Sequence, residues 1–122
     1  MLTLKFKSIQ FIKISIFEFM EKKDYILSLV KQRIANIDPN AKIYLFGSRA
    51  RNDARNNSDW DFLILTDFEV TRELKNKIID QLFETELNTD EILTGIVQNV
   101  KVWKQYAESP LYKNIQKDGV EI

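Results

Sequence analysis

Three short apolar runs, at residues 41–46, 60–65 and 92–97, constrain the fold more than any other feature of the chain. Each run contains β-branched or aromatic residues and is flanked by polar or turn-forming residues. Runs of this length and composition are typical of buried strands. The sequence therefore predicts three strands of one small sheet.

Helical spacing of apolar residues separates these predicted strands. Residues 22–37 and 71–87 each carry apolar side chains three or four positions apart, which is the pattern of a helix with one buried face. Thr71 is placed to cap the second of these helices. Ser109-Pro110 is expected to begin a last helix in the favoured order of cap and then proline, and Gly119 to end it.

Shorter segments complete the pattern. Asp38-Pro39-Asn40 predicts a turn after the first helix. Residues 49–57 are polar and predict a short helix that runs into a loop, and residues 102–106 predict another short helix. This order of helices and strands is that of an α/β (α+β) domain. We expect a small mixed β-sheet with helices packed mainly on one face.

The first 20 residues differ from the rest because they are rich in Phe and Ile. Charged residues interrupt this apolar segment, so it fits neither a signal peptide nor a transmembrane helix. We therefore expect a cytoplasmic protein. Residues 1–19 are treated as an N-terminal extension and residues 20–122 as the domain. Two alternatives stay open for the extension: an additional strand at residues 12–19, or an upstream segment that precedes a natural start at Met20.

The composition narrows the chemistry before any motif is considered. The chain has no cysteine and no histidine, so disulfides, thiolate metal sites and a histidine base are excluded. A bound metal must then have oxygen ligands, which favours Mg²⁺, Mn²⁺ or Ca²⁺. Lysine plus arginine and aspartate plus glutamate each total 18. A chain with this charge balance gives no reason to expect broad electrostatic binding to nucleic acid, and no membrane partner is predicted.

Asp59 and Asp61 flank Trp60 at the start of the second predicted strand. Side chains two positions apart on a strand point to the same face, so both carboxylates are expected on one face and Trp60 on the other. Two like charges held together require compensation, which a divalent cation supplies. Mg²⁺ commonly binds one or two carboxylates with phosphates and water, so we expect Mg²⁺ here, with Mn²⁺ as the alternative. Ser58 is expected to cap or orient this strand.

Gly47-Ser48 interrupts the chain where the first predicted strand ends. Glycine allows a phosphate to approach the backbone closely, free N–H groups at a helix start attract anions, and the Ser48 hydroxyl adds a donor. Three arginines follow as candidates to neutralise phosphate charge: Arg49, Arg51 and Arg55. The alternative is a solvated helix face on which these arginines pair with Asp53.

Gly47-Ser48, ten intervening residues and then Asp59-x-Asp61 resemble the signature of the polymerase-β-type nucleotidyltransferase superfamily. Within it, the chain is similar to the small stand-alone minimal nucleotidyltransferases. The resemblance implies the polymerase-β-like nucleotidyltransferase fold, with a nucleoside triphosphate held at Gly47 and Ser48. It also implies that Asp59 and Asp61 are catalytic and bind the metals. The candidate nucleotide-binding residues are Gly47, Ser48, Arg49, Arg51 and Ser58.

Two departures from the family pattern bear on activity. Asn52 stands where the family often has glycine, but asparagine tolerates left-handed backbone geometry. Active members usually carry a third carboxylate on the strand after the long helix, near a position, Ile92, that is apolar here. Glu91 is the candidate catalytic residue that would serve by a shifted register. The alternative is that Glu91 is an exposed residue at a strand start and that the third carboxylate is absent.

The resemblance implies transfer of a nucleotidyl group, AMP from ATP in the first instance, by two-metal Mg²⁺ chemistry. The acceptor would be a hydroxyl on a partner protein, RNA or small molecule. Minimal nucleotidyltransferases are often encoded beside HEPN-domain proteins, where they act as the antitoxin of a toxin–antitoxin pair. A HEPN-domain protein is therefore the expected partner, and a homo-oligomer is compatible with the sequence. The alternative is a nucleotide- or partner-binding module of the same fold with weak or no activity.

Overall fold

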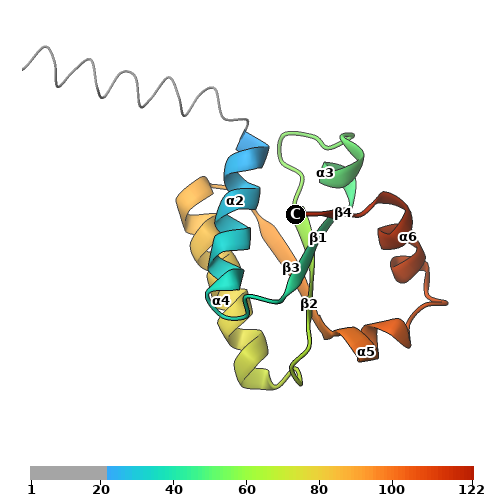
Figure 1. Ribbon diagram of the computed structural model, residues 1–122. Helices are drawn as coiled ribbons and strands as arrows, with labels where there is room; N and C mark the ends of the chain where they lie inside the picture. Colours follow the sequence, from blue (N-terminus) through green and yellow to red (C-terminus); the bar gives the residue numbers. More distant parts are fainter. Residues whose placement is uncertain (1–21) are drawn as a thin grey trace, which may run out of the picture.

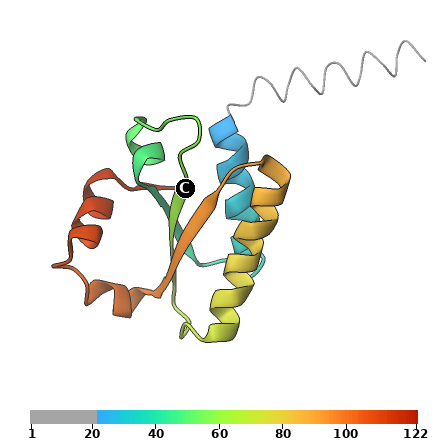
Figure 2. The ribbon, with the colours of Figure 1, turned by 180° about the vertical axis from the view of Figure 1, so that it is seen from behind.

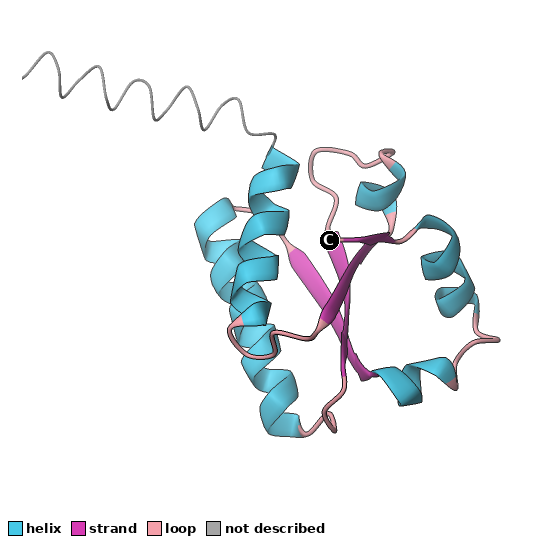
Figure 3. Ribbon diagram, in the orientation of Figure 1, coloured by secondary structure: helices cyan, strands magenta, loops and turns pink. Residues whose placement is uncertain are grey.

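The computed structural model describes residues 22–122, so the alternative strand at residues 12–19 lies outside the described residues. The elements, coloured by type in Figure 3, follow one another as α2 (Lys22–Ala35), β1 (Lys42–Phe46), α3 (Ser48–Arg51), β2 (Trp60–Thr66), α4 (Arg72–Thr89), β3 (Leu93–Asn99), α5 (Val100–Lys104), α6 (Pro110–Asp118) and β4 (Val120–Glu121). The predicted helices and the three predicted strands are confirmed, with ends that move by a few residues. The short strand β4 has no counterpart among the predicted elements.

Within residues 22–122, four strands form one mixed sheet in the order β3-β2-β1-β4. β1 runs antiparallel to β2 and to β4, whereas β2 and β3 run parallel. A parallel pair requires a crossover connection, which α4 provides here. The expected small mixed sheet is therefore confirmed, and its topology places β2 at the centre between β1 and β3.

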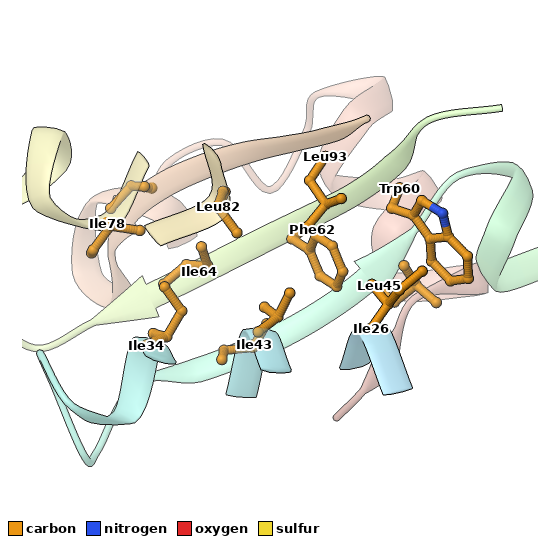
Figure 4. Close-up of a cluster of buried hydrophobic side chains, with 12 residues drawn as sticks. Ile26, Ile34, Ile43, Leu45, Trp60, Phe62, Ile64, Ile78, Leu82 and Leu93 are labelled. Atoms are coloured by element: carbon orange, nitrogen blue, oxygen red, sulfur yellow. The ribbon is translucent and has the colours of Figure 1, made fainter. Parts of the chain in front are cut away.

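The two long helices, α2 and α4, lie side by side and cover one face of this sheet (Figures 1 and 2). Alternate side chains of β1, β2 and β3 point into the layer between sheet and helices. Fully burying one such side chain stabilises the fold by about 1.5–3 kcal/mol. Figure 4 shows this main core, in which the labelled residues are Ile26, Ile34, Ile43, Leu45, Trp60, Phe62, Ile64, Ile78, Leu82 and Leu93.

The other face of the sheet lies toward the short helices α5 and α6 (Figure 1). Leu63 and Leu65 of β2 form a second, smaller cluster there with Trp103 and Ile115. The expectation of helices packed mainly on one face is thus confirmed for the long helices, and the short ones lie on the opposite side. Because residues alternate along a strand, Asp61 belongs to the face of Leu63 and Leu65.

Asp38 explains why the predicted turn after the first helix forms. Its buried carboxylate accepts a hydrogen bond from the Asn40 N–H at 3.0 Å and another from the Thr66 hydroxyl at 2.6 Å. A buried carboxylate needs such partners, since leaving it unpaired would be costly. The contact also ties the turn to the far end of β2, which fixes the strand that carries the candidate site.

Thr71 caps α4 as the sequence predicts, because its hydroxyl accepts a hydrogen bond from the Leu74 N–H at 3.1 Å. We expect Thr71→Ala to lower the free energy of unfolding by about 1 kcal/mol, since one N–H of the first turn loses its partner. Urea denaturation followed by circular dichroism measures this loss. Thr71→Ser keeps the hydroxyl and is the control, and an unchanged midpoint for the alanine variant would contradict the prediction.

Candidate functional site

Gly47 lies directly against the carboxylate of Asp61. The antiparallel register pairs Phe46, the last residue of β1, with Asp61, so the next residue passes beside the carboxylate. Gly47 has φ 74° and ψ −158°, a conformation that is essentially reserved for glycine. A Cβ atom placed on Gly47 would lie 2.5 Å from Oδ2 of Asp61. The Gly-Ser turn and the second aspartate of the signature are therefore adjacent, as neighbouring strands require.

Thr94 of β3 meets Asp61 from the other side. The parallel register of β2 and β3 pairs these two residues, and the Thr94 hydroxyl donates a hydrogen bond of 2.5 Å to Oδ1 of Asp61. The two carboxylate oxygens are thus distinguished: Oδ1 accepts from Thr94, and Oδ2 is the oxygen beside Gly47. This pairing orients a side chain that is only partly buried.

The structure confirms the predicted face of the sheet for Trp60, whereas Asp59 lies outside the strand to which that prediction applies. Trp60 is the first residue of β2 and lies in the main core (Figure 4). Alternation along the strand therefore puts it on the face opposite Asp61. Asp59 directly precedes the strand and is exposed. Strand alternation therefore separates Trp60 from Asp61 as expected, whereas Asp59 lies just outside the strand.

The loop that leads to Asp59 begins after α3, which is a single turn from Ser48 to Arg51. Asn52 ends this turn with φ 60° and ψ 28°, so asparagine takes the left-handed conformation expected at this position. Further along, the Ser58 hydroxyl accepts a hydrogen bond from the Arg55 N–H at 2.9 Å. Ser58 therefore closes the loop immediately before the first aspartate.

The arginines of this segment have different surroundings. Arg51 is about half exposed and pairs with Asp53, whose Oδ2 lies 3.1 Å from its Nε, as in the alternative of a solvated helix face. Arg55 is also exposed. Arg49 instead keeps only 16% of its side chain exposed, and its guanidinium lies over the Trp60 ring at 4.5 Å from the centroid. Only Arg49 among these three thus packs into the domain.

Glu91 lies with this buried arginine and away from Asp61. Its carboxylate is 2.5 Å from the Lys22 ammonium and 3.9 Å from Arg49, and it accepts a hydrogen bond from the Trp60 indole N–H at 3.4 Å. Because Trp60 and Asp61 point to opposite faces, Glu91 is on the helix side of the sheet. The structure therefore places Glu91 on the face of the sheet opposite Asp61, and the register pairs Asp61 with Thr94 rather than with Glu91.

The third carboxylate was expected near Ile92, but the residue that the structure places opposite Asp61 is Thr94. The expected position was wrong because the strand register pairs Asp61 with Thr94, whereas Ile92 precedes β3 and is exposed. Within residues 22–122, no group of three acidic side chains is arranged to hold a metal ion. Thr94 is the site residue that sequence reasoning missed, since a lone threonine in an apolar run carries no chemical signal.

A cavity of about 600 Å³ opens on the same face of the sheet as Asp61, between the strands and the short helices. Leu63 lines this cavity and follows Asp61 by two positions, which corresponds to about 7 Å along a strand. Trp103 and Tyr112 form part of its wall with ring centroids 5.2 Å apart. The cavity has the size of small-ligand pockets, but neither the Gly47-Ser48 turn nor Asp59, Asp61 or Thr94 lines it.

The family model described as "Nucleotidyltransferase domain" matches residues 12–121 of the chain. The chain therefore belongs to the nucleotidyltransferase domain family, whose general activity is nucleotidyl transfer, and the mixed sheet and helices are consistent with that fold. No curated protein matches the chain. None of the helices within residues 22–122 has the length and apolarity needed to cross a membrane.

Proposed function

We propose that this protein binds a nucleoside triphosphate with Mg²⁺ and transfers the nucleotidyl group, AMP from ATP, to a hydroxyl of an acceptor. The observation that carries the proposal is the close approach of Gly47 to Oδ2 of Asp61, since a Cβ there would lie 2.5 Å from that oxygen. A side chain at this position would occupy the space beside the carboxylate. Only glycine fits this close to the carboxylate, so the end of β1 and the oriented Asp61 would face one phosphate–metal complex.

The donors of the site fit magnesium better than a softer metal. Asp59 and Asp61 offer carboxylate oxygens, and the chain has neither cysteine nor histidine. Mg²⁺ is usually held by one or two carboxylates and completes its shell with water and substrate phosphates. The two aspartates would hold this ion, with Mn²⁺ as the alternative. When bound, it would neutralise charge that develops on the phosphates during in-line transfer.

The other roles follow from exposure and existing contacts. Gly47 and Ser48 would hold the triphosphate at the end of β1. Arg51, whose side chain is 44% exposed, is placed to exchange its contact with Asp53 for a phosphate. Ser58 would contribute indirectly, by holding the loop that leads to Asp59. The Arg49 guanidinium already contacts the Trp60 ring and two backbone carbonyls, so no phosphate contact is assigned to it. Glu91 has no part in the proposed reaction.

An acceptor on a partner molecule suits a domain of this size. The resemblance to minimal nucleotidyltransferases supports a HEPN-domain protein as that partner and an antitoxin role for this chain in the cytoplasm. Transfer to a protein or RNA hydroxyl would then occur beside Asp61. The domain at residues 20–122, preceded by the extension, would supply the nucleotide site while the partner supplies the acceptor.

A second function is favoured by Thr94. A threonine opposite Asp61 cannot take the proton from an acceptor hydroxyl as a carboxylate does. The domain would then be a nucleotide- or partner-binding module that performs weak chemistry or none. A partner that contributes a carboxylate to the site would reconcile the two functions.

Labelled ATP distinguishes these functions. The chain is incubated with Mg²⁺, ATP and the protein encoded next to it, and both ATP binding and label transfer are measured. We expect transfer from wild type and at least tenfold weaker Mg²⁺–ATP binding for Asp59→Asn and Asp61→Asn, because each variant removes a charged metal ligand. Asp80→Asn, an exposed site on α4, is the matched control. Binding without transfer favours the module, and absence of both refutes the proposed function.

A further inference from the structure

Arg49 packs against the two residues that flank the first aspartate of the signature, Ser58 and Trp60, and it also lines a cavity of about 390 Å³. Its side chain is 16% exposed and stacks over Trp60 at 4.5 Å. Its Nε is buried and has no hydrogen-bond partner within the described part of the chain. One donor of this partly buried guanidinium is unsatisfied, and its other contacts must offset that cost, which indicates a structural task.

The contacts of Arg49 bracket Asp59. Its Nη2 donates to the Ser58 carbonyl at 3.0 Å and to the Asn56 carbonyl at 3.3 Å. The Ser58 carbonyl belongs to the peptide group that joins Ser58 to Asp59, and Trp60 is the residue on the other side. One guanidinium therefore holds the backbone before Asp59 and the side chain after it.

Glu91 completes this arrangement. Its carboxylate lies 3.9 Å from Arg49 and accepts the indole N–H of Trp60 at 3.4 Å. The charge of Glu91 thus offsets that of the buried arginine, and its hydrogen bond fixes the ring on which the arginine stacks. Flat stacking on the indole ring requires a guanidinium, since an ammonium has no plane to stack, whereas both hydrogen bonds come from the single nitrogen Nη2.

We propose that Arg49 is a positioning residue that sets the direction of the Asp59 carboxylate by clamping the loop before it onto Trp60. The inference rests on the proposed function for its consequence, which is metal–nucleotide affinity. It reassigns Arg49 from a phosphate contact to a support for the metal ligand. The order of the loop before Asp59 would then depend on the Arg49 side chain.

Hydrogen exchange and Mn²⁺–ATP titration test this role with Arg49→Gln and Arg49→Lys. We expect at least tenfold weaker Mn²⁺–ATP binding for Arg49→Gln and at least tenfold faster exchange of the amides of residues 54–59. The amides of α4 and of the centre of β2 should keep their protection, because the main core does not depend on Arg49. Arg49→Lys keeps the charge and is expected to loosen the loop as well.

Arg72→Gln is the matched control, since Arg72 is exposed at the start of α4 and should leave both measurements unchanged. Wild-type exchange of residues 54–59 in both Arg49 variants would overturn the inference, even if nucleotide binding fell. If Arg49→Gln does not fold, Arg49→Lys decides by the same criterion. If wild type binds no Mn²⁺–ATP, the proposed function fails, while the exchange comparison still decides whether Arg49 clamps the loop.

Discussion

Gly47→Ala is expected to lower the free energy of unfolding by about 1–3 kcal/mol and to weaken Mg²⁺–ATP binding by at least tenfold. The stability loss follows from the backbone, because φ 74° with ψ −158° is a region that residues with a Cβ rarely adopt. The binding loss follows from the new methyl group, which would lie 2.5 Å from Oδ2 of Asp61 and must displace that carboxylate. Urea denaturation and calorimetric titration measure the two effects separately.

Gly95→Ala is the control that separates stability from the site. Its Cβ would collide with the Leu82 side chain, within the helix-side core and away from Asp61. We expect this variant to lose stability while its nucleotide affinity stays at the wild-type value. A Gly47→Ala variant with wild-type affinity would show that no ligand occupies the space beside Asp61.

Thr94→Asp is expected to raise the rate of nucleotidyl transfer by about a hundredfold or more, because general-base catalysis typically contributes 10²–10⁴-fold. The register places the new carboxylate opposite Asp61, where Thr94 now donates its hydroxyl. Without metal, two carboxylates directly opposite each other should cost up to about 1 kcal/mol of stability. Adding Mn²⁺ should recover that loss, and thermal unfolding with and without Mn²⁺ measures it.

Thr94→Val has nearly the same shape and lacks both hydroxyl and charge, so it should show neither the rate increase nor the response to Mn²⁺. A Thr94→Asp variant that gains no metal affinity and no activity would mean that this position does not serve as the third carboxylate. That outcome would favour the binding module. If Thr94→Asp gains metal affinity but still transfers no nucleotide, the missing component is the acceptor rather than the third carboxylate.

Local signals in the sequence were sufficient to predict the helices and the three longer strands. The helical spacing of α2 and α4, the cap at Thr71 and the left-handed Asn52 depend on residues within a few positions of one another. Physical rules for such short-range interactions apply without knowledge of the fold. The face of Trp60 also follows from alternation alone.

Contacts between residues that are distant in the sequence determine the features that could not be predicted. Which residue stands opposite Asp61 depends on the register between β2 and β3, across the whole of α4, and shifting that register by one residue would replace Thr94 with a neighbour. The place of Glu91 depends equally on Lys22 and Arg49, which are distant in sequence. β4 has only two residues and no periodicity to detect.

That short β4 has a consequence for how the sheet meets other molecules. It pairs with Tyr44 and Leu45, and the Ile122 N–H donates to the Ile43 carbonyl at 3.0 Å. It therefore occupies hydrogen-bonding groups of β1 that would otherwise form an open edge, the kind of edge that recruits strands from other chains. Loss of this pairing would expose the edge of β1 to strands of other molecules.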